Sequence, residues 1–203
     1  MYRHIIWDFD GTLFDTYPIT GSMFQKLLEE NGIHEPLTTI IKNMKVSMTH
    51  AVQHYIKQYH ISDAFLQEFQ ERSYEAELRL SKPFEGIEEI CRYIHASGRY
   101  NYLYTHRGES AILLLDRFGL KDSFRDFITS QHGFARKPSP DAIRHLSSKY
   151  KMKPEEAIMI GDRDLDIQAA VNAGIHTCYF REYGESVKAD YEITGFSQLY
   201  DIL

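Results

Sequence analysis

The chain has 203 residues, of which 43 % are hydrophobic, so it is long enough for one large domain or for a core with a modest insertion. Its net charge of −6 gives no support to a nucleic-acid-binding role. No apolar run approaches the length of about 18 residues that a transmembrane helix needs, so we expect no membrane association. Cys91 and Cys178 lie far apart in the sequence. They favour a reducing compartment, and because the first strand begins near His4 we expect no signal peptide and a cytoplasmic location.

The N-terminal part of the chain predicts one strand followed by helices only. His4–Asp10 is a short β-rich apolar run that reads as a buried strand. From about Pro18 to Lys82 the apolar spacing is helical. Gly32 is expected to end the first of these helices, and Ser47 and Ser62 are each expected to cap the start of another.

From Lys82 onward the pattern changes to alternating helices and strands. Such alternation predicts right-handed crossovers and a parallel sheet covered on both faces. We therefore expect an α/β fold, a doubly wound Rossmann-like core of residues 1–15 and 82–203 with an inserted α-helical cap of residues 16–81. The predicted strands are 101–106, 126–130, 157–162 and 176–180, and the predicted helices are 85–97, 109–118, 139–151 and 164–173.

Polar residues follow several of the predicted strands, at the carboxyl-terminal edge where such sheets bind their ligands. Asp8 and Asp10 end the first strand, Thr105 ends the second, and Asp162 ends the strand "AIMIG". Lys137 lies in "RKPSPD", between the third strand and the next helix. The topology therefore predicts that these separate segments meet at one edge of the sheet.

The residue types at this edge indicate a particular chemistry. Asp8, Asp10 and Asp162 crowd negative charges together, and a hard divalent cation relieves their repulsion. Oxygen ligands without His or Cys favour Mg²⁺. Lys137 and the Thr105 hydroxyl would then hold the oxygens of an anionic group, an arrangement that suits phosphoryl transfer.

Four motifs in order resemble those of the haloacid dehalogenase superfamily of phosphohydrolases, in its branch with a small helical cap after the first motif. They are "DFDGTLFDT", Thr105, Lys137 in "RKPSPD", and "GDRDLD". The resemblance covers nearly the whole chain and is nearest to the phosphoglycolate-phosphatase-like subfamily. It implies a phosphatase fold and mechanism but fixes no substrate.

The resemblance also implies roles for the acidic residues. Asp8 would be the nucleophile that forms an aspartyl-phosphate, and Asp10 would protonate the leaving group and then activate water. Mg²⁺ would be held by the carboxylates of Asp8 and Asp162 and by the backbone carbonyl of Asp10. Asp10 also disfavours the dehalogenases themselves and the phosphonate-cleaving branch, since both lack this second acid.

Three further residues complete the set that the resemblance implies. Thr105 and Lys137 would bind phosphoryl oxygens, as catalytic and substrate-binding residues. Asp166 would lie just outside the metal and orient its waters or Lys137.

The chain departs from the common family pattern at two motifs, and its cap offers one further candidate. The second motif continues as "THRG", so His106 and Arg107 either contact substrate or lie on an exposed loop. Arg163 replaces a common serine and either faces the site or faces solvent. In the cap, Lys45 is a candidate contact for a second anionic or polyhydroxyl group of the substrate, and an exposed lysine is the alternative.

The sequence thus predicts an Mg²⁺-dependent phosphatase that hydrolyses a small phosphorylated metabolite. It acts on no nucleic acid or membrane, and both a monomer and a homodimer remain open. One alternative is a phosphomutase of the β-phosphoglucomutase kind, which would need the same motifs, although Thr12 leans towards the phosphatases. The other is a phosphosite-binding regulatory protein that has lost catalysis.

Overall fold

The computed structural model describes residues 1–182 and 186–203. They divide into two compact units. One unit comprises Met1–Phe14 and Pro83–Leu203, and the other comprises Asp15–Lys82.

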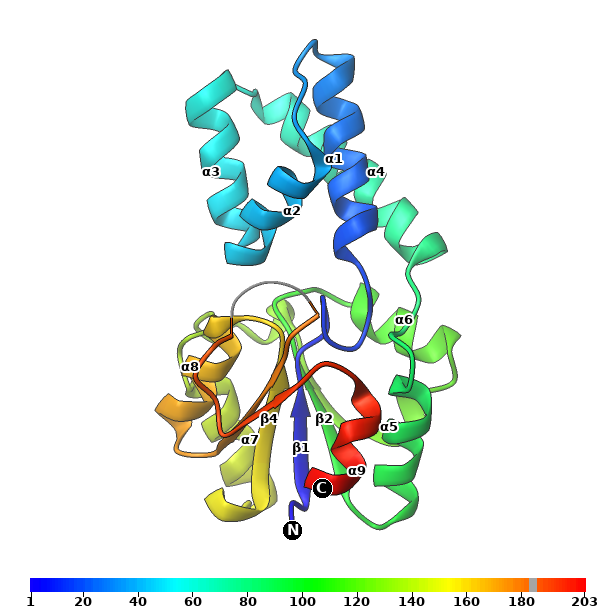
Figure 1. The fold of residues 1–203 in the computed structure, drawn as a ribbon, viewed down its shortest axis with the longest axis vertical. Helices are drawn as coiled ribbons and strands as arrows, with labels where there is room; N and C mark the ends of the chain where they lie inside the picture. Colours follow the sequence, from blue (N-terminus) through cyan, green and yellow to red (C-terminus); the bar gives the residue numbers. More distant parts are fainter. Residues whose placement is uncertain (183–185) are drawn as a thin grey trace. The chain divides into compact units, whose positions relative to one another are not determined.

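The first unit is built on a six-stranded sheet with the order β3-β2-β1-β4-β5-β6, in which every neighbouring pair is parallel. The chain runs outward from β1 to β3 on one side and then returns to build β4 to β6 on the other (Figure 1). This reversal of strand order is the topological switch point at which such sheets place their ligands. The strands are β1 (His4–Trp7), β2 (Tyr100–Tyr104), β3 (Phe124–Ile128), β4 (Ala157–Gly161), β5 (His176–Phe180) and β6 (Tyr191–Ile193).

Helices cover both faces of this sheet, as an all-parallel sheet requires. Helices α7 and α8 pack on one face, where Ile6, Tyr102 and Met159 contribute to a buried cluster with residues of both helices. Helix α5 packs against β2 from the other face (Figure 1). The helices of this unit are α5 (Ile87–Ala96), α6 (Ser110–Arg117), α7 (Asp141–Tyr150), α8 (Asp164–Ala173) and α9 (Leu199–Ile202).

The central strand β1 is buried along its whole length. The Trp7 indole donates to Asn101 Oδ1 at 2.9 Å, and Asn101 Nδ2 in turn donates to the carbonyls of Cys91 and Ser123. Every polar group of this pair therefore has a partner inside the core. Trp7 thus packs as a core residue next to the strand end that carries Asp8.

The parallel α/β architecture is confirmed, but several predicted strand boundaries are wrong. Strand β1 ends at Trp7 rather than at Asp10, because the chain turns at Phe9. Strand β3 lies two residues earlier than predicted, since Thr129 already caps a short 3₁₀ turn. Strand β6 was not predicted, because its three residues are too few to show a period.

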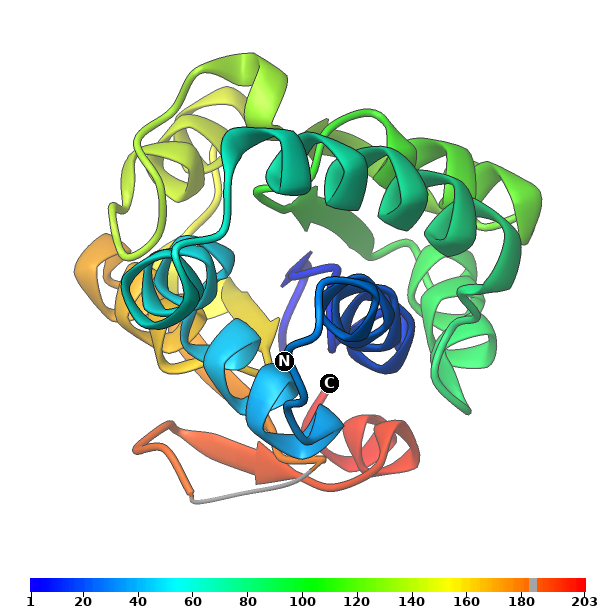
Figure 2. The ribbon, with the colours of Figure 1, turned by 90° about the horizontal axis from the view of Figure 1, so that it is seen from above.

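The second unit contains only helices, in agreement with the sequence pattern. They are α1 (Tyr17–Glu30), α2 (Leu37–Val46), α3 (Met48–Tyr59) and α4 (Asp63–Leu80), and they can be followed in Figure 2. Gly32 lies in the left-handed region just after α1, at φ +75°. The hydroxyls of Ser47 and Ser62 accept hydrogen bonds from the backbone amides of His50 and Phe65, so both predicted caps are confirmed.

This helical unit has its own core. Phe24 of α1 packs against the rings of Tyr55, Phe65 and Phe69 from α3 and α4. Thr20 of α1 donates a hydrogen bond to the buried carboxylate of Glu77 on α4, which links the first and last helices of the unit. Within the described part of the chain, no helix is both long and apolar enough to span a membrane.

Candidate active site

The turn after β1 presents two carboxylates. The Asp8 amide still pairs with the Ile160 carbonyl of β4 at 2.9 Å, as in the sheet. The chain then reverses, because the Phe9 carbonyl accepts the amides of Thr12, Leu13 and Phe14, and Gly11 takes a left-handed conformation at φ +77°. Asp8 is consequently buried and 1 % exposed, whereas the side chain of Asp10 is 27 % exposed.

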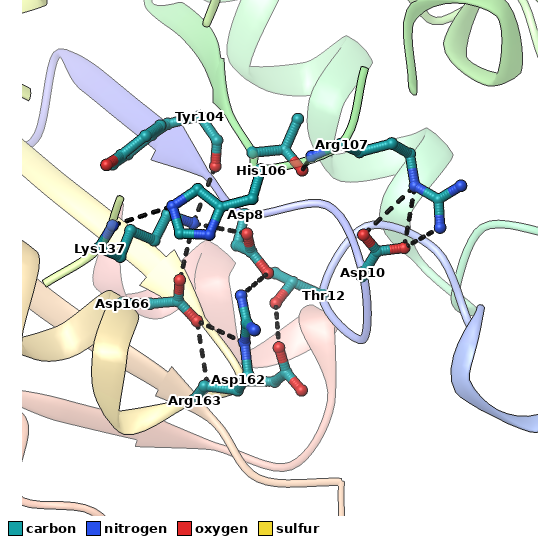
Figure 3. A network of polar contacts seen from close by, with 11 residues as sticks. Asp8, Asp10, Thr12, Tyr104, His106, Arg107, Lys137, Asp162, Arg163 and Asp166 are labelled. Atoms are coloured by element: carbon teal, nitrogen blue, oxygen red, sulfur yellow. Dashed lines mark hydrogen bonds and ion pairs between the residues drawn. The ribbon is translucent and has the colours of Figure 1, made fainter. Parts of the chain in front are cut away.

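A buried lysine joins Asp8 to the start of α8. Lys137 Nζ lies 2.5 Å from Asp8 Oδ1, 2.7 Å from Asp166 Oδ1 and 2.9 Å from the Tyr104 carbonyl (Figure 3). Lys137, Asp8 and Asp166 form an ion triplet, and all three side chains are buried. The triplet ties the ends of β1 and β2 to the loop before α7 and to the first turn of α8.

Burial and neighbouring charges perturb the triplet in opposite directions. Burial, helped by the charge of Asp166, raises the pKa of Asp8 to about 6, although Lys137 and Arg163 oppose the rise. Burial would also raise the pKa of Asp166, but Lys137 and Arg163 outweigh it and lower that pKa. Burial opposes the charge of Lys137, yet Asp166 and Asp8 hold its pKa above the usual value. Lys137 is thus a fixed positive charge against Asp8.

A third carboxylate joins Asp8 and Asp166. Asp162 follows β4, and its Oδ1 accepts a hydrogen bond from the Thr12 hydroxyl at 3.2 Å. Oxygens of Asp8, Asp162 and Asp166 all lie within 4.8 Å of one another. Gly161 makes this approach possible, because a Cβ there would lie 2.4 Å from Asp166 Cβ.

The segment that follows β2 contributes Thr105 and Arg107 to the site. The Thr105 hydroxyl accepts the amide of Arg107 at 3.0 Å, which shapes the turn. The guanidinium of Arg107 contacts both oxygens of Asp10, with Nη2 2.5 Å from Oδ1 and Nε 3.2 Å from Oδ2 (Figure 3). Arg107 is therefore turned towards the first motif and is not on an exposed loop.

His106 is half-buried beside this turn. Its Nε2 accepts the backbone amide of Lys137 at 2.9 Å, so the imidazole positions the lysine loop. Burial and the nearby charges of Lys137, Arg136 and Arg163 lower the pKa of His106 to about 3. The ring is accordingly neutral at physiological pH.

Arg163 faces the site rather than solvent, which settles the question that the sequence left open. Its side chain is 14 % exposed, with Nη2 3.9 Å from Asp8 Oδ2 and Nε 3.7 Å from Asp166 Oδ2. The carboxylate cluster therefore has two cationic neighbours, Lys137 and Arg163.

The structure brings nearly all sequence-predicted site residues to one edge of the sheet in the first unit. The exception is Lys45, which belongs to the second unit, in the last turn of α2, with Nζ 5.1 Å from the centre of the Tyr17 ring. Tyr104 was not singled out from the sequence, and Thr12 was named only because it leans towards the phosphatases, yet these two residues orient Lys137 and Asp162. The position of Thr12 inside the first motif is the sequence feature that could have identified it as a site residue. Tyr104 acts through its backbone carbonyl, which no sequence pattern reveals.

The carboxylate cluster suits a hard divalent cation. All donors are oxygens, which fits Mg²⁺ better than zinc or copper. Asp8 Oδ2 is buried and accepts no hydrogen bond from any described residue, so it could bind a metal ion without losing a hydrogen bond. Asp8 and Asp162, with Asp166 beside them, are the residues that would hold the ion.

A doubly wound parallel sheet with carboxylates and a lysine at its switch point defines an α/β enzyme with its site at the carboxyl ends of the strands. The chain belongs to the haloacid dehalogenase-like hydrolases, because the profile of that family matches residues 5–180.

Relatives and solved structures agree with this assignment. A phosphoglycolate phosphatase of Vibrio vulnificus is 29 % identical over 132 residues, which cover 62 % of this chain and 58 % of the relative, so the match spans less than two thirds of that protein. The pyrophosphatase PpaX of Halalkalibacterium halodurans is 26 % identical and covers 98 % of this chain and 95 % of its own length. A predicted phosphoglycolate phosphatase from Haemophilus somnus shares the fold with a TM-score of 0.85 at 20 % identity, covering 99 % and 97 % of the two chains.

Proposed function

We propose that this hydrolase is an Mg²⁺-dependent phosphatase that acts on a small phosphorylated metabolite through an aspartyl-phosphate. The observation that carries the proposal is the environment of Asp8. Its carboxylate is buried, paired through one oxygen with Lys137, and its other oxygen belongs to the cluster with Asp162 and Asp166. The names of the relatives, a phosphoglycolate phosphatase and a pyrophosphatase, support phosphate-ester or anhydride substrates.

In the first step, a carboxylate oxygen of Asp8 attacks phosphorus, the bond to the leaving oxygen breaks, and Asp10 gives that oxygen a proton. In the second step, Asp10 takes a proton from water, which attacks phosphorus and releases phosphate and the free Asp8 carboxylate. Arg107 orients Asp10 through both carboxylate oxygens and remains protonated itself, because a guanidinium does not deprotonate in proteins. Mg²⁺ would neutralise charge on the phosphoryl group and on Asp8.

The remaining residues bind and orient. The Lys137 ammonium, held in place by Asp166 and the Tyr104 carbonyl, is proposed to turn the donor that now faces Asp8 towards a phosphoryl oxygen bound there. The Thr105 hydroxyl stands at the end of the neighbouring strand and is proposed to donate to the same group. His106 supports Lys137 through its backbone amide.

We also propose that the enzyme works in the cytoplasm and that its helical unit covers the bound substrate. Cys91 and Cys178 are both free and buried, which fits a reducing compartment such as the cytoplasm. The helical unit of Asp15–Lys82 is proposed to act as the cap that closes over the bound substrate and excludes water.

The test is turnover of a generic aryl phosphate by the purified protein, with and without Mg²⁺, together with trapping of the phospho-enzyme. We expect Mg²⁺-dependent release of phosphate, no phospho-enzyme in Asp8→Asn, and a longer-lived phospho-enzyme in Asp10→Asn. Near-normal turnover by Asp8→Asn would exclude the mechanism. Transfer of the phosphoryl group to a sugar phosphate instead of water would identify a phosphomutase, and absence of any turnover would favour a phosphosite-binding protein.

A further inference from the structure

Arg163 occupies a position inside the carboxylate cluster that the proposed mechanism does not use. It follows Asp162 directly and precedes α8, and its backbone amide donates to Asp166 Oδ2 at 3.1 Å. Its guanidinium lies 3.9 Å from Asp8 Oδ2 and 3.7 Å from Asp166 Oδ2 (Figure 3). With only 14 % of the side chain exposed, the charge is directed at the cluster and not at solvent.

The Asp8 oxygen that Arg163 approaches is the oxygen that a metal ion would need. Within the described residues, Asp8 Oδ2 accepts no hydrogen bond, while Asp8 Oδ1 is already paired with Lys137. The two Arg163 distances exceed those of hydrogen bonds, so its attraction to Asp8 and Asp166 is mainly that of a nearby charge. Such a contact can be given up more easily than a bidentate pair.

We propose that Arg163 is an internal counter-cation of the metal site, which stabilises the metal-free cluster and which the incoming divalent cation must displace from Asp8. The inference rests on the metal site of the proposed function. A guanidinium and a divalent cation beside one carboxylate oxygen repel each other strongly at distances of a few ångströms in a buried site. Arg163 therefore weakens metal binding, and it moves away from Asp8 when the metal enters.

The proposal makes a reciprocal prediction, because a group that binds only the metal-free state must oppose the metal. Arg163→Met removes the charge and keeps most of the side-chain volume. We expect it to bind Mg²⁺ at least about tenfold more tightly in titration calorimetry, since even a partly screened unit charge at this range exceeds that effect. Arg163→Lys keeps a positive charge and should bind Mg²⁺ much as the wild type does.

Thermal unfolding provides the second readout. Without metal, Arg163→Met should melt below the wild type, because three carboxylates lose a cation. With saturating Mg²⁺ the two proteins should melt at similar temperatures, so the rise caused by Mg²⁺ is larger in the variant. Arg136→Met is the matched control: Arg136 is exposed and immediately precedes Lys137, and its loss should change neither readout.

Unchanged or weaker Mg²⁺ binding by Arg163→Met would overturn the proposal. So would an equal loss of melting temperature with and without Mg²⁺, which identifies a merely structural residue. Should Arg163→Met fail to fold without metal, the smaller change Arg163→Gln supplies the same comparison. Absence of Mg²⁺ binding by the wild type itself would overturn the metal site of the proposed function, whereas binding that ignores Arg163 would overturn only this inference.

Discussion

The Asp10 carboxylate is held by an ion pair with Arg107. The sequence left Arg107 either as a substrate contact or as a residue of an exposed loop, and the structure pairs its guanidinium with both oxygens of Asp10. The same guanidinium lies over the Phe9 ring, 5.5 Å from its centre, which limits its freedom. Arg107 is therefore a positioning residue for Asp10 in the proposed mechanism.

Arg107→Gln separates this role from substrate binding. If Arg107 positions Asp10, kcat for an aryl phosphate should fall, on the order of 10²-fold for a misplaced catalytic group. If Arg107 instead binds substrate, KM should rise while kcat stays nearly constant. Arg107→Lys keeps the charge but not the planar fork, so its kcat should lie between those of the wild type and Arg107→Gln. Steady-state kinetics distinguish the two cases.

His106 links the site to acid stability. Its pKa is lowered to about 3 in the folded protein, whereas an unfolded histidine titrates near 6.5. Between these two pKa values, His106 is therefore neutral in the folded protein and protonated in the unfolded protein. The contribution of neutral His106 to stability is fully present above about pH 6.5 and is lost progressively as the pH falls towards 3.

His106→Gln removes this titration and keeps a hydrogen-bond acceptor for the Lys137 amide. The wild type should lose more free energy of unfolding between pH 7 and pH 5 than the variant does, because only the wild type carries a histidine that protonates on unfolding. Urea unfolding at the two pH values measures this difference. Equal losses in the two proteins would show that His106 is not the group responsible.

At the scale of elements, the site depends on how closely α8 begins beside β4. Gly161 ends β4, and the side chain of Asp166 lies over it from the first turn of α8. A Cβ at residue 161 would lie 2.4 Å from Asp166 Cβ and 2.7 Å from Asp166 Cγ, both too close for real contacts. The glycine is thus required for space, and the position of Asp166 against Lys137 follows from it.

Gly161→Ala should therefore lower stability by about 1–3 kcal/mol, the usual effect of overpacking. It should also weaken Mg²⁺ binding, because Asp166 and its neighbour Asp162 must shift. Gly195→Ala is the control, since a Cβ there meets no atom within 4 Å. Denaturant unfolding and Mg²⁺ titration of both variants test the prediction, and equal behaviour of the two would contradict it.

At the scale of the whole molecule, the chain passes between its two units twice. Phe14 and Pro83 pair as an isolated bridge in the first unit, while the Asp15 amide donates to the Lys82 carbonyl at 3.1 Å in the second. The chain thus leaves the first unit after Phe14 and enters it again at Pro83. In the proposed mechanism the motifs of the first unit bind the phosphoryl group and the metal, so we expect residues of the helical unit to contribute to substrate selection.

Lys45→Ala tests whether the helical unit contacts substrate. KM for the physiological substrate, identified by screening phosphorylated metabolites, should rise, while a small aryl phosphate should be hydrolysed almost as before. Lys42→Ala is the matched control, since Lys42 is an exposed lysine on the same helix. Equal effects of Lys45→Ala on both substrates, or none on either, would assign substrate selection to other residues.

The parallel α/β core could be predicted from the sequence, as could the helical stretch after β1 and the residues of the candidate site. These follow from local signals: buried strands read as continuous apolar runs, caps need Ser or Gly, and parallel topology brings strand ends to one edge. Helix α2 (Leu37–Val46) lies inside the stretch that was predicted to be helical, but its own bounds were not predicted, because the β-branched residues of "TTII" obscure the spacing of its apolar residues.

The directions of the arginine side chains and the pairing of charges could not be predicted from the sequence and became clear from the folded structure. Asp8 and Lys137 are 129 positions apart in the chain, and Arg107 and Asp10 are 97 apart. A lysine or arginine side chain is long and flexible, so its partner depends on the residues that the fold packs around it. A sequence pattern does not show which residues these are. For this reason the motif residues could be predicted, whereas the inward turn of Arg163 onto Asp8 and Asp166 could not.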